Sequence, residues 1–181
     1  MDTNKPTLGK IPKLKISDIK IICDSREGKN HSYQSLFEEM GFSTIIGTLS
    51  TGDYSLDFMK NQISAERKSI NDLAQSLVNT NRERFFKEIV RLRGFKFRYL
   101  IIESESGQIS SNCYKSRVHS NAILGSLARI AMDVNIIFGV SRKEAAYMLG
   151  KIFFFHAQDA YRIATSSIFS IPELSKKIVV P

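Results

Sequence analysis

A short pattern of acidic and basic residues in the first half of the chain has the side chains that metal-assisted phosphate chemistry requires. Gly52 and Asp53 precede one predicted strand, and Glu66, Arg67 and Lys68 lie near the end of the next. Because side chains alternate along a strand, Glu66 and Lys68 face one side together and Arg67 faces the other. We expect Asp53 to lie close enough to Glu66 for the two carboxylates to share a cation beside a phosphodiester.

Hydrolysis of a phosphodiester needs an oriented water and a cation that stabilises the charge of the transition state. Oxygen ligands suit Mg²⁺ or Mn²⁺, so Asp53 and Glu66 are the predicted metal ligands, and the main-chain carbonyl of Arg67 is a further one. Lys68 is a cation beside two carboxylates and is expected to remain charged. It is predicted to orient the attacking water or to stabilise phosphate charge.

Further acidic residues extend this pattern. Asp24 and Glu27 follow an apolar strand and are expected to complete the acidic cluster, with Asp24 the better metal-ligand candidate of the two. Asp72 lies one helical turn beyond Lys68 and is expected to anchor this lysine or a water held by the metal. The alternative for Asp53, Glu66 and Lys68 is a surface hairpin with a charged face. For Asp24 and Glu27 it is turn or cap chemistry.

Hydrophobic periodicity predicts the elements that must position these residues. Strand-like apolar runs cover residues 19–23, 42–49, 54–59, 62–67, 97–103 and 135–140. Helical spacing covers residues 32–40, 70–77, 82–93, 118–133 and 142 to about 163. The last helix has Ser141 as N-cap and Glu144 at the capping-box position. The alternation predicts one α/β domain with a mixed sheet covered by helices, between a flexible basic arm (1–17) and an irregular tail (167–181).

The charge balance predicts a polyanionic partner. The 181 residues have a formal net charge of +8 and a pI of about 9.5. Nucleic acid is the first candidate partner and an anionic membrane surface the second, with charge for solubility as the alternative. No apolar run has the length of a membrane span or a signal peptide, which predicts an intracellular protein. The cysteines and histidines show no zinc-ligand spacing.

Basic residues concentrate in the predicted helix 82–93 and in the polar loop 105–117. The nucleic-acid-binding candidates are Arg82, Arg84, Lys87, Lys115 and Arg117. Contacts of such side chains with phosphate would be independent of sequence and sensitive to salt. A solvated helix face with local ion pairs, and a mobile loop, explain the same residues equally well.

The segments Asp24-Ser25-Arg26-Glu27, Gly52-Asp53 and Glu66-Arg67-Lys68-x-x-x-Asp72 resemble the nuclease domain of the XPF-type structure-specific endonucleases. The resemblance is close from about residue 21 to residue 77 and continues in element order to about residue 163. It implies an XPF-type nuclease domain over residues 18–166, with the restriction-endonuclease-like fold, a mixed central sheet flanked by helices.

The function implied by this resemblance is a Mg²⁺- or Mn²⁺-dependent DNA endonuclease that cuts branched or flap-type DNA at duplex/single-strand junctions, as in DNA repair and recombination. The implied catalytic residues are Asp24, Glu27, Asp53, Glu66, Lys68 and Asp72. Arg26 and Arg67 fall on supporting positions of the family. The implied metal ligands are Asp53, Glu66, Asp24 and the Arg67 carbonyl. Cytoplasm or nucleoid is the expected location in a prokaryote or phage, and the nucleus in a eukaryote.

Family members usually carry a tandem helix-hairpin-helix module that grips DNA, and we expect this chain to lack one. The first alternative to an enzyme is a non-catalytic, nuclease-like DNA-binding or scaffold subunit that pairs with a catalytic partner. A nuclease of the same fold with restriction-like or RNA-directed use is a further alternative. Phe153, Phe154, Phe155 and Tyr161 cover more than one face of the last helix. This pattern, with the habit of the family, predicts a homodimer through the C-terminal helices, although core packing explains it as well.

Overall fold

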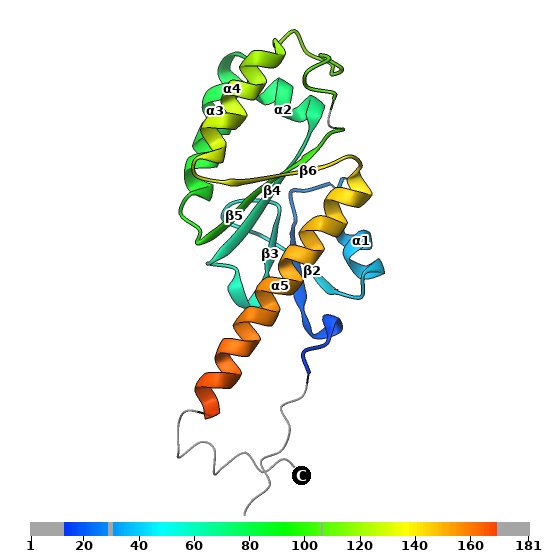
Figure 1. Ribbon diagram of the computed structural model, residues 1–181, viewed down its shortest axis with the longest axis vertical. Helices are drawn as coiled ribbons and strands as arrows, with labels where there is room; N and C mark the ends of the chain where they lie inside the picture. Colours follow the sequence, from blue (N-terminus) through cyan, green and yellow to red (C-terminus); the bar gives the residue numbers. More distant parts are fainter. Residues whose placement is uncertain (1–12, 29–30, 106, 170–181) are drawn as a thin grey trace, which may run out of the picture.

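Six strands form one mixed sheet in the computed structural model of the chain, which describes residues 13–28, 31–105 and 107–169 (Figure 1). They are β1 (Lys20–Asp24), β2 (Ser43–Gly47), β3 (Tyr54–Leu56), β4 (Ile63–Ser69), β5 (Phe97–Glu103) and β6 (Asn135–Gly139). Their order across the sheet is β2-β1-β3-β4-β5-β6. β3 is antiparallel to both of its neighbours, whereas the other three pairs of neighbouring strands are parallel.

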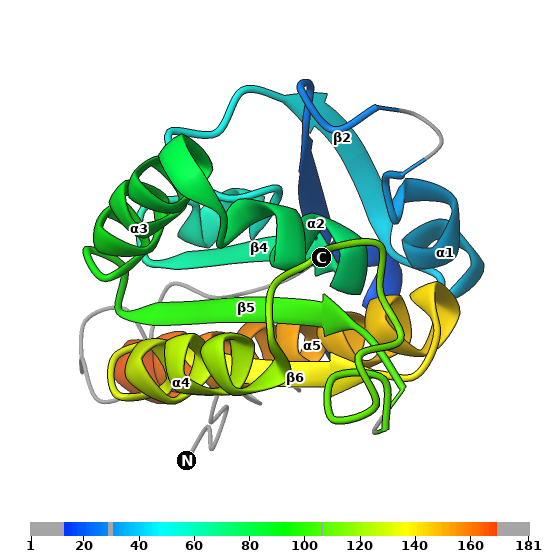
Figure 2. The same ribbon diagram turned by 90° about the horizontal axis from the view of Figure 1, so that it is seen from above.

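Helices cover both faces of this sheet (Figures 1 and 2). They are α1 (Gln34–Glu39), α2 (Ile70–Ser76), α3 (Asn79–Leu92), α4 (Ser120–Ala131) and α5 (Arg142–Phe169), with short 3-10 turns η1 (Ile16–Asp18) and η2 (Asp57–Met59). α1 and α5 pack on one face, and α2, α3 and α4 pack on the other. The predicted α/β class, with a mixed central sheet flanked by helices, is confirmed.

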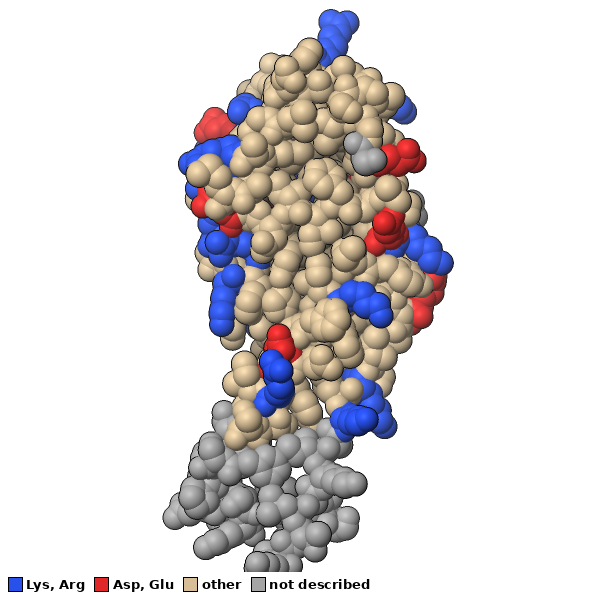
Figure 3. All heavy atoms as spheres, viewed as in Figure 1, with Lys and Arg blue, Asp and Glu red and all other residues tan. Residues whose placement is uncertain are grey.

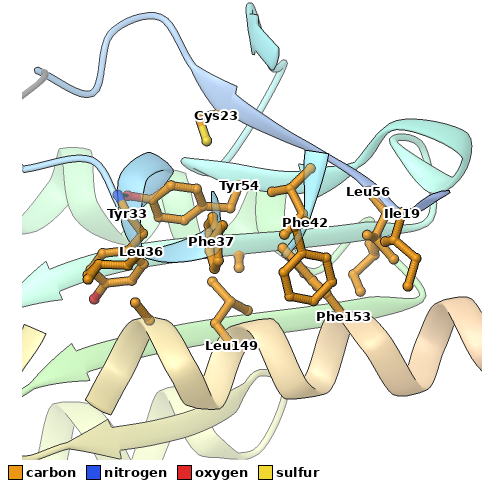
Figure 4. Close-up of a cluster of buried hydrophobic side chains, with 14 of the residues drawn as sticks. Ile19, Cys23, Tyr33, Leu36, Phe37, Phe42, Tyr54, Leu56, Leu149 and Phe153 are labelled. Carbon is orange, nitrogen blue, oxygen red and sulfur yellow. Dashed lines mark hydrogen bonds between the residues drawn. The ribbon is translucent and has the colours of Figure 1, made fainter. Parts of the chain in front are cut away.

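One apolar core lies on each face of the sheet, because the central strands are buried on both faces. The first core lies beneath α1 and α5, and the second lies beneath α2, α3 and α4. Ile101 of β5 belongs to the core beneath α1 and α5, whereas its neighbours Leu100 and Ile102 belong to the core beneath α2, α3 and α4. The first core is rich in aromatic rings (Figure 4). In this core, the ring of Tyr54 stacks on the ring of Tyr33 and makes an edge-to-face contact with the ring of Phe37.

The element limits differ from the sequence expectations at a few points. β3 ends at Leu56, and η2 replaces the rest of the strand predicted for 54–59. α5 continues to Phe169, past the predicted end near residue 163 and into the predicted tail. Leu14 and Ile16 pack against the first core, so the folded region begins before the expected boundary at residue 18. The rest of the predicted arm (1–12) and tail (170–181) lies outside the described residues.

The N-terminus of α5 is capped nearly as predicted. The Ser141 hydroxyl accepts a hydrogen bond from the Glu144 backbone N–H at 3.2 Å. The Glu144 carboxylate accepts from the Val140 N–H at 3.1 Å, one residue before the predicted partner. In the described part of the chain, no helix is long and apolar enough to cross a membrane.

Candidate active site

The ends of three neighbouring strands bring most of the predicted site residues to one edge of the sheet. β1 and β4 run in the same direction and β3 lies antiparallel between them, so β1 and β4 end where β3 begins. The Asp24 N–H donates to the Asp53 carbonyl at 2.8 Å, and the Asp53 N–H donates to the Ala65 carbonyl at 2.8 Å. These bonds place residues that are far apart in the sequence on adjacent backbone.

A small pocket of about 220 Å³ opens at this edge. Its walls are formed by Asp24, Arg26, Glu27, Ser50, Thr51, Gly52, Asp53, Glu66, Lys68, Glu88 and Arg91. Gly52 adopts a φ of 80°, and a Cβ at this position would lie 2.9 Å from the Ala65 carbonyl oxygen. Only glycine fits this close approach without strain, so Gly52 allows Asp53 to sit directly against β4.

Asp53, Glu66 and Lys68 form the centre of the pocket. The Arg67 N–H donates to Asp53 Oδ2 at 2.7 Å, and Lys68 Nζ contacts Glu66 Oε1 at 2.7 Å. Lys68 Nζ also lies 3.6 Å from Glu88 Oε2. As far as the described residues show, the second oxygen of Asp53 and that of Glu66 have no protein partner. Each of these two carboxylates therefore keeps one oxygen for a ligand.

Burial disfavours the ionised forms of Asp53 and Glu66. Burial, and then the charge of Glu66, raise the pKa of Asp53 to about 8. Burial also raises the pKa of Glu66, although Lys68 opposes the shift. Burial would lower the pKa of Lys68, but Glu66 and Glu88 outweigh it and raise this pKa, which keeps the ammonium charged. A bound cation would offset the repulsion between the two carboxylates.

The peptide group of Arg67 provides a further oxygen near Asp53. In a strand, the N–H and the C=O of one residue point to the same side. The Arg67 N–H points to Asp53, so the Arg67 carbonyl is also directed to the side of β4 that β3 leaves uncovered. The role of this carbonyl as a metal ligand stays a prediction.

Asp24 lies in the pocket, but its carboxylate is already engaged. Oδ1 accepts from the Arg26 N–H at 2.9 Å and from Arg26 Nε at 2.7 Å. Oδ2 accepts from Arg26 Nη2 at 2.9 Å and from the Leu49 N–H at 2.7 Å. Burial opposes ionisation, yet these donors lower the pKa of Asp24. The geometry thus disfavours the predicted role of Asp24 as a direct metal ligand, because Arg26 and Leu49 occupy both oxygens.

Arg67 lies on the opposite face of β4 from Glu66 and Lys68, as alternation predicts. Its Nε and Nη2 donate to the two oxygens of Glu103 at 2.9 and 2.7 Å, and its Nη1 donates to Glu27 at 3.2 Å. Tyr33 donates its hydroxyl to Glu103 at 2.7 Å. This buried network stabilises β4 on the face opposite the pocket and joins Glu27 to Arg67.

Asp72 does not line the pocket. It accepts a hydrogen bond from the Ser69 hydroxyl at 2.6 Å, and its N–H donates back to Ser69 Oγ at 3.1 Å. Ser69 is the N-cap of α2, so this exchange turns Asp72 toward the helix terminus. Glu66 and Glu88 contact Lys68 in place of Asp72. The expected contact of Asp72 with Lys68 is therefore wrong, and its alternative contact with a metal-bound water stays a prediction.

The predicted nucleic-acid-binding residues lie outside the pocket. Lys87 pairs with Glu83 at 2.7 Å, the local pair that the solvated-face interpretation expects. Arg82 donates to Ser126 at 3.2 Å, and Arg84 is exposed on the same helix. Lys115 and Arg117 are exposed residues of the loop before α4. The Lys115 N–H donates a hydrogen bond to the Asn71 side chain at 2.7 Å, and this bond holds the loop beside α2.

Glu88 and Arg91 in the pocket wall, and Glu103 beneath the pocket, are residues that the sequence pattern did not predict for the site. Glu88 and Arg91 follow the buried Phe85 at intervals of three, a spacing that places them along one side of α3. That spacing was visible in the sequence, but the approach of α3 to β4 was not. Glu103 ends an apolar strand, a common position for a functional carboxylate.

The described ranges contain no group of three or more His, Cys, Asp or Glu side chains arranged to hold a metal ion. Both oxygens of Asp24 accept from Arg26, and Oε1 of Glu27 accepts from Arg67. Asp53 and Glu66 each keep one oxygen without a protein partner in the described part of the chain. Mg²⁺ is commonly held by one or two carboxylates and several waters, so this donor set fits such a cation.

The six-stranded mixed sheet flanked by helices recurs in solved XPF structures. XPF from Aeropyrum pernix has the same fold, with a TM-score of 0.61 and 20% sequence identity over 84% of this chain and 74% of that chain. XPF from Aeropyrum pernix in complex with DNA aligns with a TM-score of 0.60 and 21% identity, over 86% of this chain and 69% of that chain. At this identity the likeness shows the fold alone.

The chain belongs to the ERCC4 domain family, whose model matches residues 23–152. The matched region includes the pocket and all predicted catalytic residues from Asp24 to Asp72. A comparison with curated proteins found no significant match. The family membership confirms the XPF-type nuclease domain that the residue pattern predicted.

Proposed function

We propose that this protein is a metal-dependent endonuclease that hydrolyses phosphodiester bonds in branched or flap-type DNA. The observation that carries the proposal is the close grouping of Asp53, Glu66 and Lys68 in one pocket, with an open oxygen on each carboxylate. Membership of a nuclease-domain family and the net charge of +8 support a nucleic-acid substrate.

Asp53, Glu66 and the Arg67 carbonyl are the groups that would hold Mg²⁺ or Mn²⁺. When bound, such a cation supplies charge stabilisation and activates water at neutral pH. Lys68, held between Glu66 and Glu88, presents a fixed positive charge to a phosphate or its attacking water. Asp24 orients Arg26 at the pocket wall, and Glu27 helps to fix Arg67.

Incubation with labelled flap, splayed-arm and three-way-junction DNA tests this function. With Mg²⁺ or Mn²⁺ we expect nicks near the junction, whereas excess EDTA should abolish them and linear duplex DNA should be cut far more slowly. Tight, salt-dependent binding without turnover in either metal would favour the alternative of a non-catalytic DNA-binding subunit. No cleavage of any branched substrate would reject the enzyme proposal.

We also propose that the protein forms a homodimer through the face that carries β6 and α5. In Figure 3 the centre of this face is almost free of charged side chains, which lie around its rim. Phe138 on β6, Val140 between β6 and α5, and Met148 on α5 are large apolar side chains exposed to solvent, and Phe138 and Val140 line a groove of about 440 Å³. Apolar patches of this kind mark protein interfaces, and a second copy presents the same uncharged surface.

Replacing Phe138 by Glu is expected to convert this dimer to a monomer, because a carboxylate would be buried without a partner. Multi-angle light scattering at about 50 µM, where even a weak interface is populated, measures the change. Ile46→Glu is the matched control, since Ile46 is 59% exposed on β2 at the opposite edge of the sheet. A monomeric wild-type protein, or equal effects of both variants, would contradict the dimer.

A further inference from the structure

The side chains that line the acidic pocket include more acidic groups than basic groups. Five of the lining side chains are carboxylates, namely Asp24, Glu27, Asp53, Glu66 and Glu88. Three are cations, namely Arg26, Lys68 and Arg91. A DNA phosphate that enters this pocket meets an excess of negative charge, so it needs a cation whose charge is not already offset by a neighbour.

Two of the three cations are engaged by carboxylates of the pocket. Arg26 donates to both oxygens of Asp24, and Lys68 lies between Glu66 and Glu88. Arg91 differs from them. Across the part of the chain that the structure describes, its guanidinium forms no ion pair and no hydrogen bond, and it is exposed to solvent. Its charge is therefore open to a ligand.

α3 determines where this guanidinium lies. The buried residues Phe85 and Ile89 anchor the helix on the second core, and Glu88 and Arg91 project at the edge of the same helix. Residues three apart are neighbours on a helix surface, and their Cα atoms are separated by about 4.5 Å along the axis. Glu88 contacts Lys68, and Arg91 lies about one helical turn beyond Glu88 on α3, in the wall of the same pocket.

We propose that Arg91 binds a backbone phosphate of the DNA strand at the mouth of the acidic pocket, next to the phosphate that faces Lys68. A guanidinium suits this task because its planar fork can donate two hydrogen bonds to two phosphate oxygens. The contact positions the strand without reading its bases. The inference rests on the proposed function, since it requires DNA to enter this pocket, and it adds a residue from outside the nuclease motif.

Fluorescence anisotropy with a labelled flap DNA in EDTA, over a series of NaCl concentrations, tests the contact without cleavage. Arg91→Ala is expected to weaken binding roughly 10-fold at low salt. It should also reduce the slope of log K against log[NaCl] by about 0.7 to 0.9, the value for one phosphate. Arg91→Lys should keep the slope but bind more weakly than wild type. Arg162→Ala, which removes an exposed arginine of α5 paired with Asp159, should match wild type.

Parallel cleavage assays in Mg²⁺ separate this inference from the proposed function. If the wild type cleaves DNA and Arg91→Ala keeps wild-type affinity and slope, the Arg91 contact is wrong and the proposed function stands. If the wild type does not cleave but Arg91→Ala lowers both affinity and slope, the contact stands and the enzyme proposal is wrong. Equal losses in Arg162→Ala, or no DNA binding by the wild type, overturn the Arg91 contact.

Discussion

Asp53→Asn and Glu66→Gln are each expected to lower metal-dependent DNA cleavage by roughly 100- to 1,000-fold, the range found when one group that stabilises transition-state charge is removed. Each change replaces a carboxylate by an amide of the same shape. The amide oxygen of Asp53→Asn can still accept the Arg67 N–H, so the local backbone should keep its position. The loss would therefore come from charge and ligand chemistry rather than from misfolding.

The same two substitutions are expected to leave the protein at least as stable as wild type. Burial raises the pKa of both carboxylates, which means that the fold holds their charged forms at a cost. Neutral amides relieve the repulsion between them, although Lys68 loses its charged partner in Glu66→Gln. Residues that serve a function at the expense of stability commonly show this combination.

Single-turnover cleavage and urea denaturation measure the two effects in the same preparations. Asp57→Asn is the matched control, because Asp57 is a surface carboxylate in η2 whose ion pair with Lys20 spans 3.9 Å. It should cleave DNA at the wild-type rate. Wild-type cleavage by both Asp53→Asn and Glu66→Gln would remove the basis for placing the metal between these residues.

Glu103→Ala is expected to destabilise the protein by about 3–5 kcal/mol, the usual cost of removing one partner from a buried ion pair. The side chains of Arg67 and Glu103 are only 8% and 11% exposed, and two hydrogen bonds join them. Without Glu103, the Arg67 guanidinium keeps only its longer bond to Glu27, and the Tyr33 hydroxyl loses its acceptor. A buried charge and a buried hydroxyl would then both lack their main partners.

Urea denaturation followed by circular dichroism measures this loss as a change in the free energy of unfolding. Glu105→Ala, two residues further along, removes an exposed carboxylate and should change the stability by no more than about 0.5 kcal/mol. The pair Glu103→Gln and Glu103→Ala separates charge from hydrogen bonding, because the glutamine can still accept from Tyr33. A Glu103→Ala variant within about 1 kcal/mol of wild type would show that the network contributes little.

Local backbone geometry explains why several site features could be predicted. Alternation along a strand placed Glu66 and Lys68 on one face of β4 and Arg67 on the other, independently of anything that packs against them. Helical periodicity located α3 and α4 within a few residues for the same reason. The roles of Asp53, Glu66 and Lys68 as metal and phosphate ligands stay predictions, which the variants above test.

Partner choice among charged side chains could not be predicted in the same way. Asp24 and Glu27 were expected to complete the acidic cluster, and both line the pocket, but their ion pairs with Arg26 and Arg67 were not expected. Asp72 was expected to reach Lys68, but Ser69 at the helix N-cap lies closer along the chain and competes for it. Each carboxylate accepts the donor that packing brings nearest, and residue types alone do not rank these donors.

By itself, the sequence determined which residue types this protein has for phosphate chemistry, the face of the strand on which each lies, and the alternation of strands and helices. The tertiary structure alone decided that α3 brings Glu88 and Arg91 to the pocket and that Glu103 supports Arg67 across 36 positions of the chain. The physical reason is the distance along the chain over which each feature is determined. Side-chain direction follows from the local backbone, whereas contacts between distant elements depend on how their apolar faces pack together.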